Sequence, residues 1–243
     1  MLNFRIVLLS ALLLMFNSIS AFALSLDGNK LVVDYNDTTN VIYYDTGAEA
    51  VKLTDTDGTK DDLNTEVLLT LAGWKSTNIF GFYDFTTDDA GNVHIGDKLQ
   101  VFSGASENTE VTIRFDLVNG TADLVNDKVD DIVNMGTTFG LYIDSTQSGS
   151  DLGGIFYSHS ALNEGGYDYF WIYDLLQWPY SGCDVIVAIE DQFKGGVDGD
   201  HNDLIVGIDD VAPAPVPEPA TMLLLGTGLI GMAGASRKKL FRK

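Results

Sequence analysis

Apolar residues between positions 24 and 211 fall in short runs, and clusters of Gly, Asn, Asp and Ser separate these runs. One run alternates strictly: Val111, Ile113, Phe115 and Leu117 are separated by single polar residues. Side chains of a β-strand point to opposite faces in turn, so this run predicts one face packed inward and one in contact with water. No window keeps a helical period over three turns, and the pattern therefore predicts an all-β domain.

The spacing of the runs predicts roughly ten strands with regular turn signals, which is typical of a β-sandwich, here of the jelly-roll type. The expected strands are residues 30–35, 40–44, 66–72, 79–85, 98–102, 110–118, 138–143, 154–158, 169–173, 184–190 and 203–209. Aromatic residues such as Phe80, Phe82 and Phe170 are expected in the core, although the same residue types could form a platform for sugar rings.

The first 23 residues have the composition of a secretory signal peptide. Arg5 supplies a positive charge, an apolar run covers residues 6–16, and Ala21-Phe22-Ala23 forms a cleavage site of small residues. We therefore expect cleavage after Ala23 and export by the general secretory route. A transmembrane anchor is the alternative, but the run is short and a cleavage site follows it.

The C-terminal end predicts a proline-rich linker followed by one membrane span. In the linker, residues 212–219, prolines alternate with small residues, which favours extended polyproline that cannot join a sheet. Residues 220–236 are mostly apolar and just long enough to cross a bilayer as a helix. The basic cluster in residues 237–243 would stay in the cytoplasm, which places the domain of residues 24–211 outside.

Pro217, Glu218 and Pro219 precede this apolar span and its basic end. The order of the three features closely resembles the PEP-CTERM sorting signal over residues 216–243. The resemblance implies recognition by a membrane-embedded exosortase, cleavage near the Pro-Glu-Pro motif, and release or transfer to the surface of a Gram-negative bacterium that makes exopolysaccharide and biofilm. The basic end is Lys-rich as well as Arg-rich, a mild departure. A permanent membrane anchor is the alternative.

A second resemblance covers residues 139–209. It is carried by the runs at 139–143, 156–158, 162–163 and 165–170, then by Ile189-Glu190-Asp191 and by residues 195–203, which read Gly-Gly-Val-Asp-Gly-Asp-His-Asn-Asp. These runs are ordered as in an exported domain of unknown function that often accompanies PEP-CTERM tails. Tyr169 stands where that family usually has a histidine. Because the family has no settled activity, the resemblance implies a fold and a setting more than a reaction.

The charge of the central segment limits its partners. Residues 24–216 contain 34 of the 35 acidic residues and 8 of the 14 basic ones, a net charge of −26. Such a segment repels nucleic acid and anionic lipid, and cations are its natural partners. The alternative is that the acids keep an exported protein soluble. Cys183 is the only cysteine, so no disulfide can form within the chain, and stability must come from the core or from ions.

An acidic loop near the end of the domain is the candidate metal site. Its sequence, from 198 to 203, is Asp-Gly-Asp-His-Asn-Asp, which places oxygen-bearing side chains at every second position. Calcium is the expected ion because it accepts six to eight oxygen ligands in irregular geometry. The alternative is a solvated acidic turn that closes a hairpin. The expected ligands are Asp198, Asp200 and Asn202, together with Glu190, Asp191 or Asp203. A second acidic stretch, residues 55–62, contains Lys60 and is expected to be an exposed turn.

Sequence motifs of catalysis such as G-x-S-x-G, H-E-x-x-H and a phosphate loop are absent. Ser158 and His159 are adjacent, and adjacent strand residues point to opposite faces, so they do not form a dyad. The sequence therefore predicts a non-catalytic surface or matrix protein that is stabilised by calcium and associated with exopolysaccharide. Two alternatives stay open. A carbohydrate-binding adhesin would expose a strip with Trp74, Trp171 or Trp178, and a polysaccharide-processing enzyme would place an acidic pair across an open cleft.

Overall fold

A computed structural model of the protein describes residues 23–34, 40–56, 58–70, 77–104, 109–125, 132–175, 183–193 and 199–215. In these ranges the regular structure consists of β-strands and three single-turn 3-10 helices: η1 (Thr146–Ser148), η2 (Ser160–Leu162) and η3 (Glu164–Gly166). Neighbouring strands pair antiparallel. The prediction of an all-β domain is confirmed.

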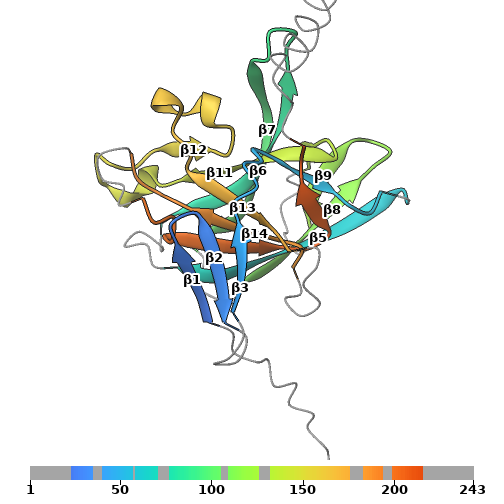
Figure 1. Ribbon diagram of the computed structural model, residues 1–243. Helices are drawn as coiled ribbons and strands as arrows, with labels where there is room; N and C mark the ends of the chain where they lie inside the picture. The colour runs from blue at the N-terminus through green and yellow to red at the C-terminus, as the bar shows by residue number, and fades with distance from the viewer. Residues whose placement is uncertain are drawn as a thin grey trace, which may run out of the picture.

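The strands form three sheets (Figure 1). A small sheet has the order β1 (Ala23–Asp27), β2 (Lys30–Asp34), β3 (Asn40–Tyr44). A seven-stranded sheet has the order β10 (Val133–Asn134), β9 (Thr121–Leu124), β8 (Glu110–Asp116), β5 (Lys60–Thr70), β15 (Leu204–Ile208), β14 (Val185–Ile189), β13 (Phe170–Asp174). A six-stranded sheet has the order β16 (Val211–Pro213), β4 (Val51–Leu53), β11 (Thr138–Asp144), β6 (Ile79–Thr87), β7 (Val93–Ser103), and β12 (Ile155–Tyr157) also pairs with β11.

The two larger sheets pack face to face around one apolar core, as in a β-sandwich. β8 shows how alternation builds this core, because Ile113 and Phe115 are buried in it and Val111 and Leu117 pack partly buried against it. The predicted inward face of this strand is therefore confirmed. Across the core, the Phe115 ring stacks on the Phe139 ring of β11, with centroids 5.4 Å apart.

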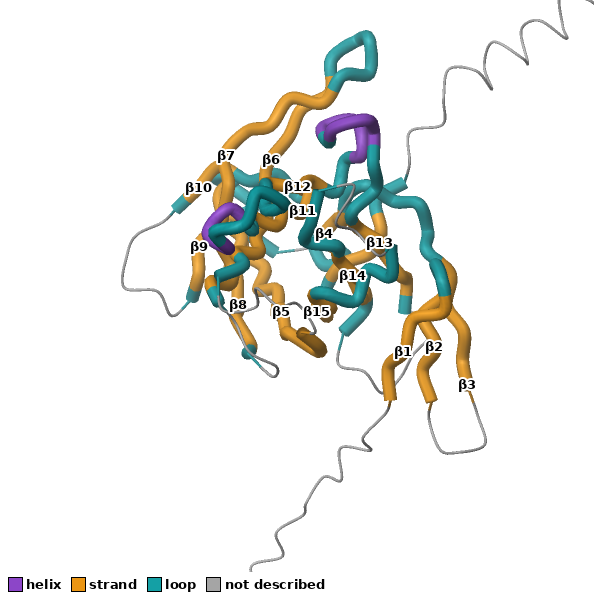
Figure 2. Tube along the Cα trace, turned by 90° about the vertical axis from the view of Figure 1, so that its left-hand side faces the viewer, coloured by secondary structure: helices purple, strands orange, loops and turns teal. Residues whose placement is uncertain are grey.

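β14 and β15 are buried on both faces, which explains their continuous apolar sequences. Val187 and Val206 belong to the core between the larger sheets, whereas Ile186 and Ile205 belong to a second core with Leu31 of β2. The small sheet therefore covers the outer face of these strands. Figure 2 shows β1, β2 and β3 on the side of β13 and β14, away from β8 and β9.

The structure lengthens some predicted strands and adds others. β5 begins at Lys60 rather than at residue 66, and β7 begins at Val93 rather than at residue 98. The expectation of an exposed turn at 55–62 is wrong for its last three residues, which pair with β8. Asp62 lies opposite Arg114 there, and this opposite charge favours an acidic residue in the strand. β1, β4, β9, β10 and β16 were not predicted, because such short or irregular segments carry no clear alternation.

The predicted proline-rich linker begins inside the fold. β16 forms the edge of the six-stranded sheet, and Pro213 lies opposite Val51 of β4. The backbone nitrogen of Ala214 donates to the Ala50 carbonyl oxygen at 2.9 Å. The expectation that this segment cannot join a sheet is therefore wrong. Because alternate backbone nitrogens of a strand point to opposite sides, the nitrogen of Pro213 faces away from β4, where a proline needs no donor.

Several predictions on the two ends lie outside the described residues: Ala21 and residues 1–22 of the signal peptide, the Pro217-Glu218-Pro219 motif, the span at 220–236 and the basic tail at 237–243. Ala23, the last residue before the predicted cleavage point, begins β1. Within the described ranges, no helix is long and apolar enough to cross a membrane. The jelly-roll type of the sandwich stays a prediction.

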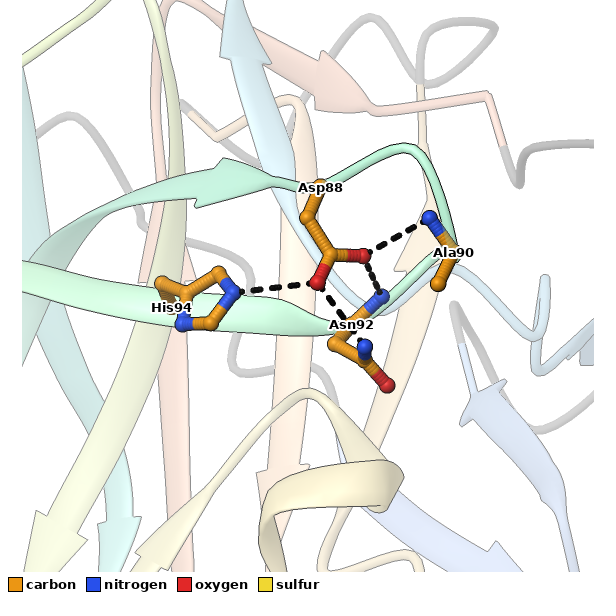
Figure 3. A network of polar contacts seen from close by, with 4 residues as sticks. All are labelled: Asp88, Ala90, Asn92 and His94. Atoms are coloured by element: carbon orange, nitrogen blue, oxygen red, sulfur yellow. Dashed lines mark hydrogen bonds and ion pairs between the residues drawn. The ribbon is translucent and has the colours of Figure 1, made fainter.

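β6 and β7 form a long hairpin whose tip projects beyond the sandwich (Figures 1 and 2). Asp88 organises the tip, as Figure 3 shows: its Oδ1 accepts hydrogen bonds from the backbone nitrogens of Ala90 (2.9 Å) and Asn92 (2.8 Å). Its Oδ2 accepts one from Asn92 Nδ2 (2.8 Å) and lies 3.3 Å from His94 Nε2. These bonds, first of all those from Asn92, lower the pKa of Asp88 to about 2.

Gly140 of β11 lies opposite the fully buried Tyr83 of β6, and a Cβ at this position would overlap the Tyr83 ring. We expect Gly140→Ala to lower the free energy of unfolding by about 1–3 kcal/mol, because overpacking displaces a buried ring. Urea denaturation of the full chain measures the change. Gly136→Ala is the matched control, since its Cβ would meet its nearest neighbour, Asp84, at an ordinary 3.4 Å. Equal losses in the two variants would contradict this account.

Candidate metal centre

The acidic residues singled out in the sequence follow β14 and precede β15. Glu190 and Asp191 come directly after Ile189, the last residue of β14, and Asp203 comes directly before β15. A bridge between Ile189 and Asn202 brings the two chain segments together. The backbone nitrogen of Glu190 also donates to the Tyr169 carbonyl oxygen at 3.0 Å, which holds this end of β14 against the segment before β13.

Three of the predicted ligands converge at this point. Glu190, Asp191 and Asp203 each offer a carboxylate oxygen, and these oxygens all lie within 4.8 Å of one another. Glu190 and Asp191 are each only 1% exposed, and Asp203 is half-buried. Calcium lies 2.3–2.6 Å from its ligands, so two oxygens of one calcium site are at most about 5 Å apart. The three carboxylates therefore fit a single calcium ion.

Hydrogen bonds fix Asp191 at the centre of this group. Its backbone nitrogen donates to Asp203 Oδ2 (3.1 Å), and its Oδ2 accepts a hydrogen bond from Asn78 Nδ2 (2.6 Å). Its carbonyl oxygen accepts one from the hydroxyl of Ser145 (2.7 Å), which in turn accepts one from the Gly154 nitrogen (3.0 Å). Asn78 and Ser145 were missed in the sequence, because one polar residue beside a strand gives no signal of a site more than forty positions away.

The structure describes two of the three alternate positions of the loop, Asp200 and Asn202. Asp200 Oδ2 accepts a hydrogen bond from Asn202 Nδ2 (2.6 Å), and Asp200 Oδ1 accepts one from the Asn202 nitrogen (3.2 Å). These two side chains therefore bond to each other, and Asp200 is not among the acids that converge with Asp203. Asp198 lies outside the described residues. Among the described acids, Glu190, Asp191 and Asp203 therefore form the convergent group, and ion binding by Asp200 and Asn202 stays a prediction.

His201 stands beside the cluster in a tight turn, with a backbone φ of +52°. Its ring stacks on Trp171 of β13, with centroids 3.6 Å apart and an angle of 12° between the planes. Its Nε2 donates to the Asp168 carbonyl oxygen at 3.0 Å. Burial lowers the pKa of His201, so the ring is neutral at pH 7. Tyr169, at the position where the resembling family has a histidine, is buried and stacks on Phe156 at 4.1 Å.

Asp168 is a carboxyl group that burial holds partly protonated near neutral pH. Desolvation, with smaller contributions from the charges of Asp45 and Glu49, raises the pKa of Asp168 to about 6. A hydrogen bond from the Phe170 nitrogen to its Oδ1 (3.0 Å) acts in the opposite direction. The raised pKa of Asp168 therefore reflects mainly the poor hydration of its carboxyl group.

A second acidic group lies at the other end of β14. Asp184 precedes this strand, Asp209 and Asp210 follow β15, and their carboxylate oxygens lie within 4.8 Å of one another. Burial, then repulsion from Asp209, raises the pKa of both Asp184 and Asp210. All three are partly exposed. This group was not predicted, because Asp184 lies 25 positions before Asp209 in the sequence.

One comparison with known proteins identifies the C-terminal segment. A family model described as the PEP-CTERM protein-sorting motif matches residues 215–238. The resemblance of this end to the sorting signal is thereby confirmed, and the motif implies an exported protein that an exosortase recognises and that is held in the membrane before processing. The match does not include residues 139–209, so the second resemblance stays a prediction. Searches among curated proteins and among solved structures find no match to the chain.

The raised pKa of Asp168 predicts a pH dependence of stability. The folded protein holds this proton up to about pH 6, whereas the unfolded chain releases it near 3.8, so the stability from this group falls as pH rises between these values. We expect Asp168→Asn to remove this fall and to gain at most about 3 kcal/mol over wild type between pH 4 and pH 7. Urea denaturation in EDTA across this range measures it.

Asp88→Asn is the control, because the pKa of Asp88 is shifted in the opposite direction to that of Asp168. The lowered pKa of Asp88 means that this carboxylate stabilises the fold above its unfolded pKa and that the stabilisation is lost as pH falls toward about 2. The variant should therefore leave the slope between pH 4 and pH 6 unchanged. Parallel curves for wild type and Asp168→Asn would contradict the assignment.

Proposed function

We propose that this chain is an exported, non-catalytic protein of the cell surface or extracellular matrix, which an exosortase sorts through its C-terminal end and which calcium stabilises. The observation that carries the calcium proposal is the convergence of Glu190, Asp191 and Asp203 within 4.8 Å, with two of the three nearly inaccessible to water. Exopolysaccharide is the proposed partner of the mature protein. The sandwich is proposed to be of the jelly-roll type.

Electrostatics supports a cation at this place. Carboxylates removed from water lose their hydration, and three of them at close range repel one another. A hard divalent ion offsets both costs at once, and a set of oxygen donors alone suits calcium better than zinc, whose sites usually include nitrogen or sulfur ligands. The outside of the cell also suits such a site, since extracellular calcium modules bind with dissociation constants of about 0.1–1 mM.

The absence of any disulfide within the chain makes an ion more useful. Cys183 is the only cysteine, so an exported domain of this sequence cannot use the covalent links that stabilise many secreted proteins. An ion that binds the folded state alone stabilises it by mass action. Calcium would therefore raise stability in the compartment where the protein acts.

The sorting proposal rests on the matched segment at 215–238. Within it, Pro217, Glu218 and Pro219 are the proposed recognition motif, residues 220–236 the membrane span and residues 237–243 the cytoplasmic end. We propose cleavage of the signal peptide after Ala23, transient anchoring in the inner membrane with the domain outside, and then processing near the motif. A permanent anchor is the alternative outcome.

The surroundings of the adjacent Ser158 and His159 support the non-catalytic part of the proposal. Ser158 Oγ donates to the Glu49 carbonyl oxygen (2.6 Å) and accepts a hydrogen bond from the Leu141 nitrogen (2.9 Å). His159 Nδ1 lies 2.5 Å from the hydroxyl of Tyr83, and both Ser158 and His159 are buried. These groups hold strands together rather than face a substrate.

Trp171 bears on the adhesin alternative. One face of its ring is covered by His201, so that face is not available for a sugar. Trp74 and Trp178, the other predicted members of an exposed strip, lie outside the described residues. The carbohydrate-binding adhesin and the polysaccharide-processing enzyme remain as alternatives.

Thermal unfolding of the full chain in detergent tests the calcium site. We expect about 10 mM calcium, roughly 10–100 times a dissociation constant of about 0.1–1 mM, to add about 1.4–2.7 kcal/mol and to raise the melting temperature by several degrees relative to EDTA. Asp191→Asn and Glu190→Gln should each abolish the calcium-dependent rise, whereas Asp200→Asn should preserve most of it.

Asp88→Asn, at the distant hairpin tip, is the matched control and should keep the full calcium-dependent rise. If calcium leaves the melting temperature of the wild type unchanged, the acidic residues serve solubility and local structure, and the calcium proposal is wrong.

Replacement of Pro217, Glu218 and Pro219 together by alanine tests the sorting proposal. In a host that contains an exosortase, we expect the variant to stay in the membrane fraction at full length, because the enzyme no longer recognises it. Immunoblots of membrane and extracellular fractions measure the distribution. Pro213→Ala, a proline of β16 outside the motif, is the control and should be processed normally. Normal processing of the triple variant would refute the assigned motif.

A further inference from the structure

Asn78, the residue before β6, lies beside the acidic cluster, and its side-chain oxygen Oδ1 has no partner among the described hydrogen bonds. Its side chain is 6% exposed. Nδ2 donates to Asp191 Oδ2 at 2.6 Å, whereas Oδ1 is buried and has no hydrogen-bond partner among the residues that the structure describes. A buried amide oxygen without a partner is unfavourable and rare in folded proteins. An ion or a buried water molecule would satisfy this oxygen.

The oxygen belongs to a side chain that contacts Asp191, one of the three converging acids. Oδ1 and Nδ2 of one amide share a single carbon atom, so Oδ1 is only two bonds away from the atom that contacts Asp191. Oxygens up to about 5 Å apart can bind the same calcium ion. Amide oxygens are common calcium ligands, and one calcium ion takes six to eight oxygen ligands in total, waters included. Three carboxylates and one amide oxygen leave room for water to complete the shell.

Asn78 comes from a different sheet than the three acids. Glu190, Asp191 and Asp203 flank β14 and β15 of the seven-stranded sheet, whereas Asn78 precedes β6 of the six-stranded sheet. Ser145, which donates to the Asp191 carbonyl oxygen, follows β11 of that same sheet. At this end of the sandwich, polar groups of the two sheets therefore meet directly.

We infer that Asn78 Oδ1 is a ligand of the calcium ion, and that the ion thereby joins the two sheets of the sandwich. The inference rests on the calcium site proposed above and adds to it a ligand from the opposite sheet. Because packing of the core sets the distance between the sheets, it also sets the distance between Asn78 and the acids before the ion arrives. The site is in this sense preorganised by the core.

A neutral ligand is also the favourable choice at this position. Three carboxylates already exceed the charge of one divalent ion, and a fourth would increase repulsion in the ion-free protein. Exchange of the Asn78 amide for a carboxylate distinguishes two roles of this residue. If Asn78 is a ligand, the carboxylate strengthens ion binding. If Asn78 only positions Asp191, the exchange removes the hydrogen bond to Asp191 and weakens ion binding.

Calcium titrations of the full chain in detergent, by calorimetry and by melting temperature, test the inference with two variants. We expect Asn78→Ala to weaken calcium binding on the order of tenfold or more. We expect Asn78→Asp to lower the melting temperature in EDTA and yet to bind calcium at least as tightly as the wild type, so that its calcium-dependent rise exceeds the wild-type rise.

Asn163→Ala is the matched control, since Asn163 is also buried but its side chain forms hydrogen bonds with backbone groups. Its Oδ1 accepts from the Tyr157 nitrogen (2.9 Å), and its Nδ2 donates to the carbonyl oxygens of Tyr157 (2.7 Å) and Tyr167 (2.9 Å). This variant should melt lower with and without calcium by similar amounts, and should keep the wild-type calcium affinity.

The outcomes separate this inference from the site on which it rests. If the wild type binds calcium and Asn78→Ala binds it equally well, the site stands and Asn78 is not a ligand. If both Asn78 variants lose the calcium-dependent rise, Asn78 only positions Asp191, and the inference is overturned. If the wild type shows no calcium binding, the proposed site fails and the inference fails with it.

Discussion

Packing of the seven-stranded sheet on the six-stranded sheet is the interaction on which the rest of this structure depends. Aromatic rings contribute to this contact: Phe115 of β8 stacks on Phe139 of β11 in the opposite sheet, and Phe139 packs against Phe82 of its own sheet with centroids 4.7 Å apart. The described residues contain no α-helix and the chain cannot form an internal disulfide, so burial of these apolar faces is the main favourable term.

The small sheet of β1–β3 adds a third layer over part of the sandwich. Without it, Tyr173, Ile186 and Ile205 would face water from β13, β14 and β15. The layer begins at Ala23, where the predicted signal peptide ends, and β16 at the other end of the domain is followed directly by the segment of the sorting motif.

Polar groups in this architecture concentrate at the ends of β14 and β15. Strand ends are the places where a chain rich in Asp must leave the apolar interior, and carboxylates from separate segments meet there. At one end, Glu190 and Asp191 are buried, and Asp191 accepts hydrogen bonds from Asn78 and Ser145, which flank strands of the opposite sheet. At the other end, Asp184, Asp209 and Asp210 are close together but partly hydrated. This difference in burial distinguishes the proposed calcium site from a cluster that water can screen.

Local pattern determined the fold class and several strands of this protein. The alternation at 111–117 and the apolar runs of β14 and β15 depend only on neighbouring residues, so they could be recognised in the sequence. The same holds for the sorting motif, whose features are contiguous. The short strands β4, β9, β10 and β16 could not be recognised, because pairing with distant partners, rather than their own pattern, makes them strands.

The candidate site, too, could be predicted from the sequence only in part. Alternate spacing in the sequence pointed to Asp198, Asp200 and Asn202, with Glu190, Asp191 or Asp203 as additional ligands. Only the tertiary structure shows that the carboxylates of Glu190, Asp191 and Asp203 converge, because the register of β14 and β15 determines which carboxylates meet. It alone brought in Asn78, since the packing of two sheets joins residues 113 positions apart in the chain.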